Sequence, residues 1–207
     1  MKVDPGTLDW KEAYKLLIGS VLPRPIAFVS TVDQYGRCNL APFSFFTGIC
    51  ANPMMVCFAP MFRGTDGKKK DTLANIETTG QFVINIVGEQ IAAQMNDCAM
   101  EYPPEVDEFI QTGLSKIPSD CVKPPRVKEC DVHLECTLHQ IVTLGEHPGS
   151  GSLVIGRVVC VHVQDELFEN GKINSEKLRP IGRMAGQTYT RAVSDTFELE
   201  RKKQQGK

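Results

Sequence analysis

The sequence predicts a mainly β fold with α-helical insertions, built as an antiparallel barrel or sandwich. At least six segments combine β-branched or aromatic residues with short flanking turns. Helical periodicity is confined largely to the middle of the chain. Because helices do not alternate with strands, a parallel Rossmann-type sheet is disfavoured. The glycine-rich motifs G-x-G-x-x-G and G-x-x-x-x-G-K-[ST] are also absent from the sequence.

Four strands are expected in the first half of the chain, at residues 26–32, 39–49, 54–60 and 81–87. The residues DQYGR form the turn between the first two, and CANP separates the second from the third. Pro42 lies inside the second strand, and proline cannot donate a hydrogen bond to a sheet ladder. This strand is therefore expected at a sheet edge, at a bulge or at an irregular stretch that faces a ligand.

Helices are expected between these strands and after them. A helix of about two turns is predicted from Asp71 to near Gly80, because Leu73 and Ile76 share one side of it. Residues 88–128 are predicted to form a helical excursion, since apolar residues recur there at helical spacing. These residues are Ile91, Met95, Cys98, Val106, Phe109 and Ile110.

Two long strands and a polar tail are expected in the last third of the chain. Residues 131–144 alternate apolar and polar side chains, which is typical of an antiparallel strand with one solvated face. Residues 152–168 are predicted to form a second long strand with a bend at Gly156. Residues 192–207 are expected to be a polar tail, and the whole chain, 1–207, to form a single domain.

Composition argues against several classes of protein. The chain has 23% charged and 42% hydrophobic residues and a net charge of -2, whereas general nucleic-acid binders are usually basic. No apolar run approaches the length of a membrane span, and the N-terminal stretch lacks the hydrophobic region of a signal peptide. We therefore expect a cytoplasmic protein that binds neither nucleic acid nor membranes.

The sequence predicts no metal site and no protein nucleophile. The eight cysteines form no C-x-x-C pair and are expected mainly as buried free thiols. The four histidines show no metal-ligand spacing, and the G-x-S-x-G motif is absent from the sequence. His147 differs from the other histidines because it lies in a turn between two long strands, where a side chain can reach a ligand.

The lysine run at 68–70 has two interpretations. A short charge run is most often solvated. Here it directly precedes Asp71 and Thr72 at the expected start of a helix, whose free N–H groups and dipole favour an anion. A lysine and a threonine hydroxyl would complete a phosphate site. Lys70 is the lysine expected to contact a phosphate, and Lys68 and Lys69 are expected to face solvent.

Two further segments indicate a flat, charged ligand. Arg24, between two prolines, places a guanidinium beside the first strand, and guanidinium suits bidentate contact with a phosphate or a carbonyl edge. Residues 39–46, NLAPFSFF, combine small residues, a hydroxyl and aromatic rings. Small residues let backbone groups approach a ring closely, while aromatic neighbours exclude water from it.

The order of several motifs resembles the flavin reductase-like family, the FMN-binding split-barrel group that includes flavoredoxins. The motifs are PRPIAFVST, NLAPFSFF, NPMMVCFAP, KDTLANI, FVINIV, GEHPGSGSLVIG and LRPIGRMAGQTY, and the resemblance runs from about Tyr14 to Tyr189. It implies a six-stranded antiparallel Greek-key split β-barrel that acts as a homodimer. It also implies a non-covalently bound FMN in a groove near the dimer interface.

The resemblance implies roles for individual residues. The segment 39–45 is expected along the isoalloxazine ring and ribityl chain, and the Lys-Asp-Thr motif at the phosphate. His147 matches a histidine of a family turn, although the PGSGS that follows it departs from the family pattern, as does Ala185 in place of a glycine. The residues expected at the cofactor are Arg24, Ser30, Thr31, Asn39, Ala41, Pro42, Phe43, Ser44, Phe45, Lys70, Asp71, Thr72 and Arg183, with Gly186 and Tyr189 matching nearby family positions.

The resemblance leaves three functions open. The first is an FMN-dependent oxidoreductase that moves electrons from NAD(P)H or a reduced partner to flavin or a small acceptor. The second is a flavoredoxin-type electron carrier, which exchanges electrons with a partner protein and has no NAD(P)H turnover of its own. The third is a flavin-storage protein without catalysis. Because flavin itself carries out the redox chemistry, no catalytic side chain is required, and His147 is the one candidate.

Overall fold

The structure, a computed structural model, describes residues 1–200 of the chain. The helices are α1 (Trp10–Ser20), α2 (Asp71–Thr79), α3 (Ala92–Asp97), α4 (Glu108–Thr112) and α5 (Ser175–Leu178), with the 3-10 helices η1 (Pro5–Thr7), η2 (Glu89–Ile91) and η3 (Asp165–Leu167). The strands are β1 (Arg24–Pro25), β2 (Ala27–Val32), β3 (Cys38–Phe43), β4 (Phe46–Ala51), β5 (Met54–Phe58), β6 (Gln81–Ile86), β7 (Lys116–Ile117), β8 (Arg126–Val127), β9 (Val132–Thr143), β10 (Ser152–Val163), β11 (Phe168–Glu169), β12 (Lys172–Ile173), β13 (Ile181–Arg183) and β14 (Tyr189–Arg191).

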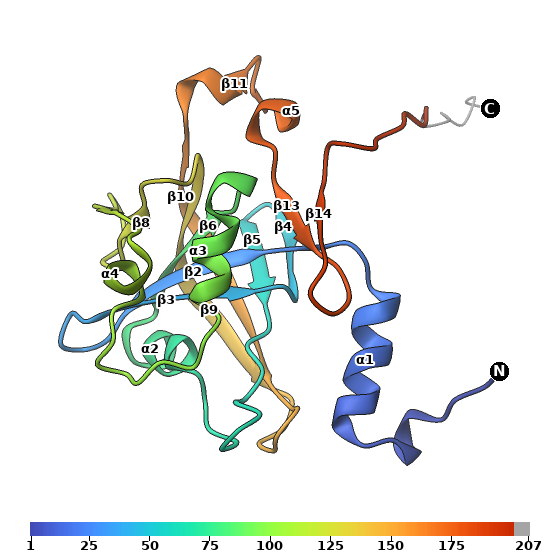
Figure 1. Cartoon of the computed structure of the whole chain (residues 1–207). Helices are drawn as coiled ribbons and strands as arrows, with labels where there is room; N and C mark the ends of the chain where they lie inside the picture. Colours follow the sequence, from blue (N-terminus) through green and yellow to red (C-terminus); the bar gives the residue numbers. More distant parts are fainter. Residues whose placement is uncertain (201–207) are drawn as a thin grey trace.

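Seven antiparallel strands form the main sheet, in the order β3-β2-β6-β9-β10-β5-β4. The sheet curls into a split barrel of Greek-key type, in which strands far apart in sequence, such as β5 and β10, are neighbours. A three-stranded sheet, β1-β13-β14, lies beside the barrel, and α1 stands outside it (Figure 1). The mainly β antiparallel class predicted from the sequence is confirmed.

The expectation of six strands is wrong by one, because the segment 39–49 is two strands rather than one. β3 pairs with β2 at one end of the sheet order, whereas β4 pairs with β5 at the other end. The chain changes partner at Ser44 and Phe45, so the ladder must break there. Pro42 lies in β3, which is an edge strand of this sheet, as its missing N–H predicted.

The strand expected over 152–168 is also shorter than predicted. β10 ends at Val163, and the backbone then turns into η3. The bend predicted at Gly156 is confirmed by a register shift between Ile155 and Gly156 in the pairing with β9. A Cβ atom at Gly156 would lie 2.3 Å from Cζ of Phe82, so only glycine fits against this ring.

Helix α2 follows the sequence prediction closely. It begins directly after Lys70 and ends at Gly80, whose φ of 67° is the left-handed conformation that glycine adopts at helix C-termini. Leu73 and Ile76 are buried on the side that faces the barrel. The start of the helix is therefore held in place by the packing of its apolar side.

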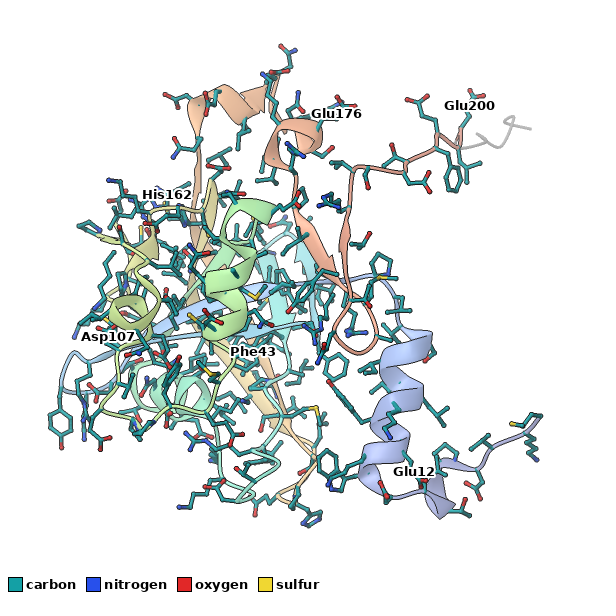
Figure 2. All side chains as sticks on the ribbon, in the orientation of Figure 1. Glu12, Phe43, Asp107, His162, Glu176 and Glu200 are labelled. Carbon is teal, nitrogen blue, oxygen red and sulfur yellow. The ribbon has the colours of Figure 1, made fainter. Side chains whose placement is uncertain are left out.

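The hydrophobic core has two parts, which lie on opposite sides of the sheet. One part fills the barrel and includes Val29, Phe43 (labelled in Figure 2) and Phe82. The centres of the Phe43 and Phe58 rings lie 5.1 Å apart. The other part lies between the sheet and residues 88–128, and includes Phe28, Met95 and Phe109. The segment 88–128 contains η2, α3, α4, β7 and β8.

The polar face predicted for 131–144 is solvated only in the second half of β9, where His139 is exposed. In the first half the prediction is wrong. His133 and Glu135 are both buried, because residues 118–127 cover them. Burial lowers the pKa of His133 to about 4, so the ring is neutral near pH 7. Three of the eight cysteines (Cys98, Cys130 and Cys136) are buried free thiols, as expected, whereas Cys50 and Cys121 are exposed.

The predicted tail at 192–207 is described only in part. Residues 192–200 contain neither helix nor strand, and residues 201–207 lie outside the described part of the chain. Among residues 1–200, no helix combines the length and the hydrophobicity needed to cross a membrane.

The buried side chain of Asn85 connects the two parts of the fold. Its Nδ2 donates to the carbonyl of Phe28 on β2, at 2.9 Å. Its Oδ1 accepts from the backbone N–H of Val127, at 2.9 Å, and lies 2.8 Å from Nδ1 of His133. One carboxamide therefore satisfies polar groups of the barrel and of the segment that covers it.

We expect Asn85→Ala to lower the free energy of unfolding by roughly 2–4 kcal/mol, because it leaves buried donors and acceptors unpaired. Urea denaturation of the variant and parent measures the change. Gln140→Ala, at an exposed position of β9, should change the free energy by less than about 0.5 kcal/mol. Equal effects of the two substitutions would contradict this role for Asn85.

Candidate functional site

A pocket lies where the N-terminus of α2 meets β3 and the segment 98–102. We call it the Lys70 pocket. Six of its residues were predicted at the cofactor, three within 39–42 and three within 70–72, so the structure brings these two segments together. The lining residues are Asn39, Ala41, Pro42, Arg63, Lys70, Asp71, Thr72, Cys98, Ala99, Met100, Glu101, Tyr102 and Glu108.

Lys70 is half-buried in this pocket, unlike its exposed neighbours Lys68 and Lys69. Lys69 forms an ion pair with Glu77, with 2.7 Å between Nζ and Oε1. Lys68 forms one with Asp66, with 3.8 Å between Nζ and Oδ2. Lys70 makes no such ion pair with any residue of 1–200. Burial lowers its pKa, which is the direction expected for an ammonium group withdrawn from water. A half-buried cation without an ion-pair partner indicates a site for an anion.

The other polar groups at the start of α2 are already ordered. Asp71 pairs with Arg63 at 2.7 Å, so its carboxylate charge is neutralised within the pocket. Asn39 Nδ2 donates to Thr72 Oγ1 at 2.9 Å, which leaves the hydroxyl proton of Thr72 available for an acceptor. No side chain of residues 1–200 caps the N-terminus of α2. Its first N–H groups and the positive end of its dipole therefore also favour an anion.

Glu108 adds a titratable group beside this pocket. Its carboxylate is buried and accepts from the backbone N–H of Leu40 at 3.0 Å. Burial raises the pKa of Glu108 to about 7. Near neutral pH the group is therefore partly protonated, which limits the negative charge close to Lys70.

Arg24, Ser44, Phe45 and Arg183 gather at a second place, beyond the end of β3. The Arg24 guanidinium is buried and donates to the carbonyls of Ile18 and Met184, both at 2.9 Å, and of Val21 at 3.0 Å. Its Nε donates to Ser44 Oγ at 3.3 Å, and its carbon Cζ lies 5.8 Å from the centre of the Phe45 ring. Most of the donors of Arg24 are therefore used to hold the protein together.

Arg183 lies next to this cluster in β13. Its guanidinium donates to the Tyr189 hydroxyl and to the carbonyl of Gly186. The pKa of Arg24 is lowered, mainly by burial and to a smaller extent by the positive charge of Arg183. The Tyr189 hydroxyl in turn donates to Asn96 Oδ1 at 3.0 Å. These contacts connect the hairpin β13–β14 to α3.

Four predicted residues lie outside both the Lys70 pocket and the cluster around Arg24. The Phe43 side chain is part of the barrel core. Ser30 is fully buried and donates to the carbonyl of Pro125 at 2.5 Å, and Thr31 accepts from Asn75 Nδ2 at 3.0 Å. His147 is exposed in the turn after β9 and is not among the residues that line the Lys70 pocket.

Sequence reasoning missed Arg63, Glu108 and the segment 98–102. Arg63 lies in an irregular stretch outside any motif, and its role follows only from its contact with Asp71. The sequence shows Glu108 as an acidic residue within a predicted helix. It does not show that this residue is buried against β3, because the burial depends on how the helix packs.

Comparison with known proteins gives consistent matches. The profile of the family described as "Flavin reductase like domain" matches residues 18–181. A protein of Halalkalibacterium halodurans is 41% identical over 203 residues, covering 97% of this chain and 96% of that protein.

Two solved structures share both fold and sequence with the chain. Nitrilotriacetate monooxygenase component B from Bacillus cereus has a TM-score of 0.90 and 38% identity, and the match covers 96% of this chain and 98% of that one. The 2-nitrobenzoate 2-nitroreductase of Pseudomonas fluorescens has a TM-score of 0.86 and 30% identity, with 98% and 96% covered.

The raised pKa of Glu108 makes a prediction about stability. Because the folded pKa, about 7, lies above the ordinary value of 4.5, the contribution of this group to stability is complete below pH 4.5 and is lost as the pH rises through 7. Glu108→Gln keeps an oxygen for the Leu40 N–H but cannot ionise. We expect its free energy of unfolding, relative to the parent, to rise by about 2–3 kcal/mol from pH 5 to pH 8.

Chemical denaturation at both pH values measures this difference. Glu105→Gln, at an exposed position, serves as the control and should give parallel curves. A Glu108→Gln difference that does not depend on pH would show that the carboxyl group titrates normally.

Proposed function

The chain belongs to the flavin reductase-like family, and we propose that it is an FMN-binding oxidoreductase that transfers electrons from NAD(P)H or a reduced partner to flavin or another small acceptor. The observation that carries the proposal is Lys70, a half-buried cation with no ion pair among residues 1–200, at the uncapped start of a nine-residue helix. This arrangement suits the phosphate of FMN.

The Lys70 pocket offers a phosphate group a cation and several hydrogen-bond donors. Lys70 contributes a charge, Thr72 a hydroxyl proton, and α2 its first N–H groups. Arg63 compensates the charge of Asp71, which would otherwise repel the anion. The partly protonated Glu108 reduces repulsion further.

β3 provides a path from this pocket to the Arg24 cluster. It is an edge strand of the main sheet, so one side of its backbone is not paired within that sheet and can face a flat ring. Ala41 and Pro42 line the pocket, and Ser44 and Phe45 contact Arg24 farther along. The N–H groups near 41–46 and the buried guanidinium would stabilise negative charge on a ring there. FMN, when bound, supplies the redox chemistry.

The proposal includes a homodimer. α1 exposes Leu16 and Leu17 at 51% and 48%, and β4 exposes Ile49 at 48%. Exposed apolar side chains grouped on two elements are typical of an interaction surface. The exposed pocket between α1 and the barrel, lined by Tyr14, Leu17 and Phe45, continues this surface.

The two similar solved structures direct the choice of acceptors. The Bacillus cereus protein is a component of nitrilotriacetate monooxygenase, and the Pseudomonas fluorescens protein is a 2-nitrobenzoate 2-nitroreductase. Free FMN and 2-nitrobenzoate are therefore the first acceptors to compare for this chain.

The function is tested by mixing FMN-loaded protein with NADH or NADPH without oxygen and following the visible absorption of the flavin. The oxidoreductase predicts rapid loss of absorption, and its return when an acceptor is added. Persistent absorption with both nucleotides would favour the flavoredoxin-type carrier instead. A colourless protein that takes up no added FMN would refute every flavin function.

The phosphate site makes a separate prediction. The double variant Lys70→Ala, Thr72→Ala should bind FMN at least about tenfold more weakly, since each lost charge-assisted hydrogen bond contributes about 1.5–3 kcal/mol. Fluorescence titration of FMN measures the dissociation constant, and circular dichroism checks the fold.

Lys68→Ala is the matched control for this variant. Lys68 is exposed and lies beside Asp66 rather than in the pocket, so its removal should leave FMN affinity within about twofold of the parent. If the double variant bound FMN as tightly as Lys68→Ala, the phosphate would lie elsewhere.

A further inference from the structure

A cluster of soft and hard metal-binding groups lies on β9, β10 and the loop before β8. Its members are Asp120, Cys121, Glu135, Cys160 and His162, and we call it the Cys160 cluster. None of these residues lines the Lys70 pocket, and the flavin function proposed above uses none of them. In Figure 2, His162 lies far from Glu12 of α1, toward the other side of the molecule.

The sheet itself places three of the five groups together. Cys160 and His162 are two residues apart on β10, so their side chains leave the same face of the strand. Glu135 on β9 is the Cα partner of Cys160 across the ladder. The three side chains therefore converge without any contribution from flexible segments.

The loop supplies the other two groups, and Glu135 holds that loop in place. Glu135 is fully buried, and its two oxygens accept from the backbone N–H groups of Asp120 at 2.9 Å and Cys121 at 2.6 Å. Both side chains of the loop are exposed. A cation can therefore reach the cluster from solvent, while a buried carboxylate orients the backbone that carries two of the ligands.

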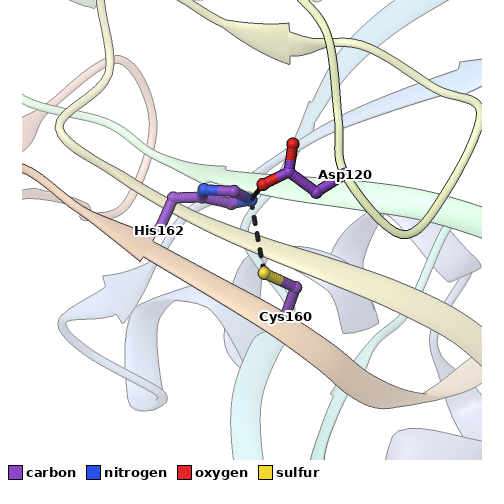
Figure 3. Close-up of side chains that lie close together, drawn as sticks. All are labelled: Asp120, Cys160 and His162. Atoms are coloured by element: carbon purple, nitrogen blue, oxygen red, sulfur yellow. Dashed lines mark hydrogen bonds and ion pairs between the residues drawn. The ribbon is translucent and has the colours of Figure 1, made fainter.

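Two overlapping sets of donor atoms in the cluster are each close enough to share one cation. The ring nitrogen Nε2 of His162 lies 3.4 Å from Cys160 Sγ and 3.9 Å from Asp120 Oδ2 (Figure 3). The ligand atoms of Asp120, Cys160 and His162 all lie within 4.8 Å of one another, and so do those of Cys121, Glu135 and Cys160. Cys160 belongs to both groups and is the common ligand.

We propose that the Cys160 cluster binds Zn²⁺ through Asp120, Cys160 and His162, whose donor atoms already lie together, and that the exposed side chain of Cys121, which lies beside Cys160, closes onto the cation as the fourth ligand. Two thiolates, an imidazole and a carboxylate form the ligand set of a closed, four-coordinate site, which is typical of structural zinc. Binding releases the two thiol protons to solvent, and the cation replaces the proton that His162 shares with Glu135 at 2.6 Å.

The charges around the cluster suit a divalent cation. Asp120 and Glu135 are acidic. The guanidinium of Arg126 is close to Glu135, with its Nε 3.9 Å from Oε1 of that carboxylate. With two thiolates formed, the bound cation and Arg126 offset most of the negative charge. The metal would fasten the loop at 120–121 to β10, and so stabilise the segment that covers the buried face of β9.

Zinc binding is tested on the full chain after treatment with a chelator and a thiol reductant. Titration against a chromophoric chelator should show one equivalent of Zn²⁺ per chain. Co²⁺ in place of Zn²⁺ should give a thiolate-to-metal charge-transfer absorption, which reports the cysteine ligands directly. Zn²⁺ should also raise the melting temperature, because it binds only the folded site.

Variants assign the ligands. Cys160→Ser and His162→Gln should each weaken Zn²⁺ binding by more than about 100-fold, because loss of a ligand exceeds the effect of an outer residue. Cys121→Ser, at an exposed loop position, gives the same test if a β10 variant fails to fold. Cys50→Ser and His139→Gln, both exposed and outside the cluster, should bind Zn²⁺ as the parent does.

Three results would overturn the proposal. The first is the absence of stoichiometric Zn²⁺ binding by reduced, folded protein. The second is a Co²⁺ complex without thiolate absorption, and the third is unchanged affinity in both Cys160→Ser and Cys121→Ser. A Cys121–Cys160 disulfide in protein prepared without the reductant, together with the first result, would show that the two thiols pair with each other rather than bind a metal. The FMN dissociation constant should be the same in all these variants, so failure here is distinct from failure of the flavin function.

Discussion

The burial of both faces of β2, β6 and β9 is the constraint on which the rest of the structure depends. An ordinary antiparallel sheet can leave one face in water, but here the inner face fills the barrel and the outer face is covered by residues 88–128. Polar groups caught between these layers must find partners inside the protein. Asn85 meets this need by bonding to the barrel strand and to the covering segment at once.

This covering segment also creates the Lys70 pocket. Because α4 packs against β3, Glu108 reaches the Leu40 N–H and residues 98–102 close one side of the pocket. Lys70 is then shielded from water while its two neighbours remain exposed. The same packing that completes the core therefore half-buries Lys70 at the beginning of a short helix, and the proposed phosphate site depends on this arrangement.

The same constraint accounts for the Cys160 cluster. Covering the polar face of β9 buries Glu135, and the buried carboxylate is satisfied by the N–H groups of Asp120 and Cys121. That contact brings the loop side chains over Cys160 and His162. The phosphate proposal thus concerns the edge strand β3, whereas the metal proposal concerns the interior strands β9 and β10 of the same sheet. Either proposal can fail without the other.

The sequence by itself determined most strands of the main sheet and helix α2, and it named most residues of the proposed phosphate site. Alternation, turn residues and Gly80 predicted the main strands and the ends of α2, and the Lys-Asp-Thr motif predicted the residues at its start, because these signals are local in the chain. Only the tertiary structure decided that residues 39–49 divide into two strands. It also decided that most N–H groups of Arg24 donate to backbone carbonyls, and that Arg63 and Glu108 line the Lys70 pocket. It also gathered the donors at 120, 121, 135, 160 and 162, which no spacing in the sequence indicated. The physical reason is that strand pairing and side-chain burial depend on contacts between residues far apart in sequence, whereas propensity and capping depend on neighbours along it.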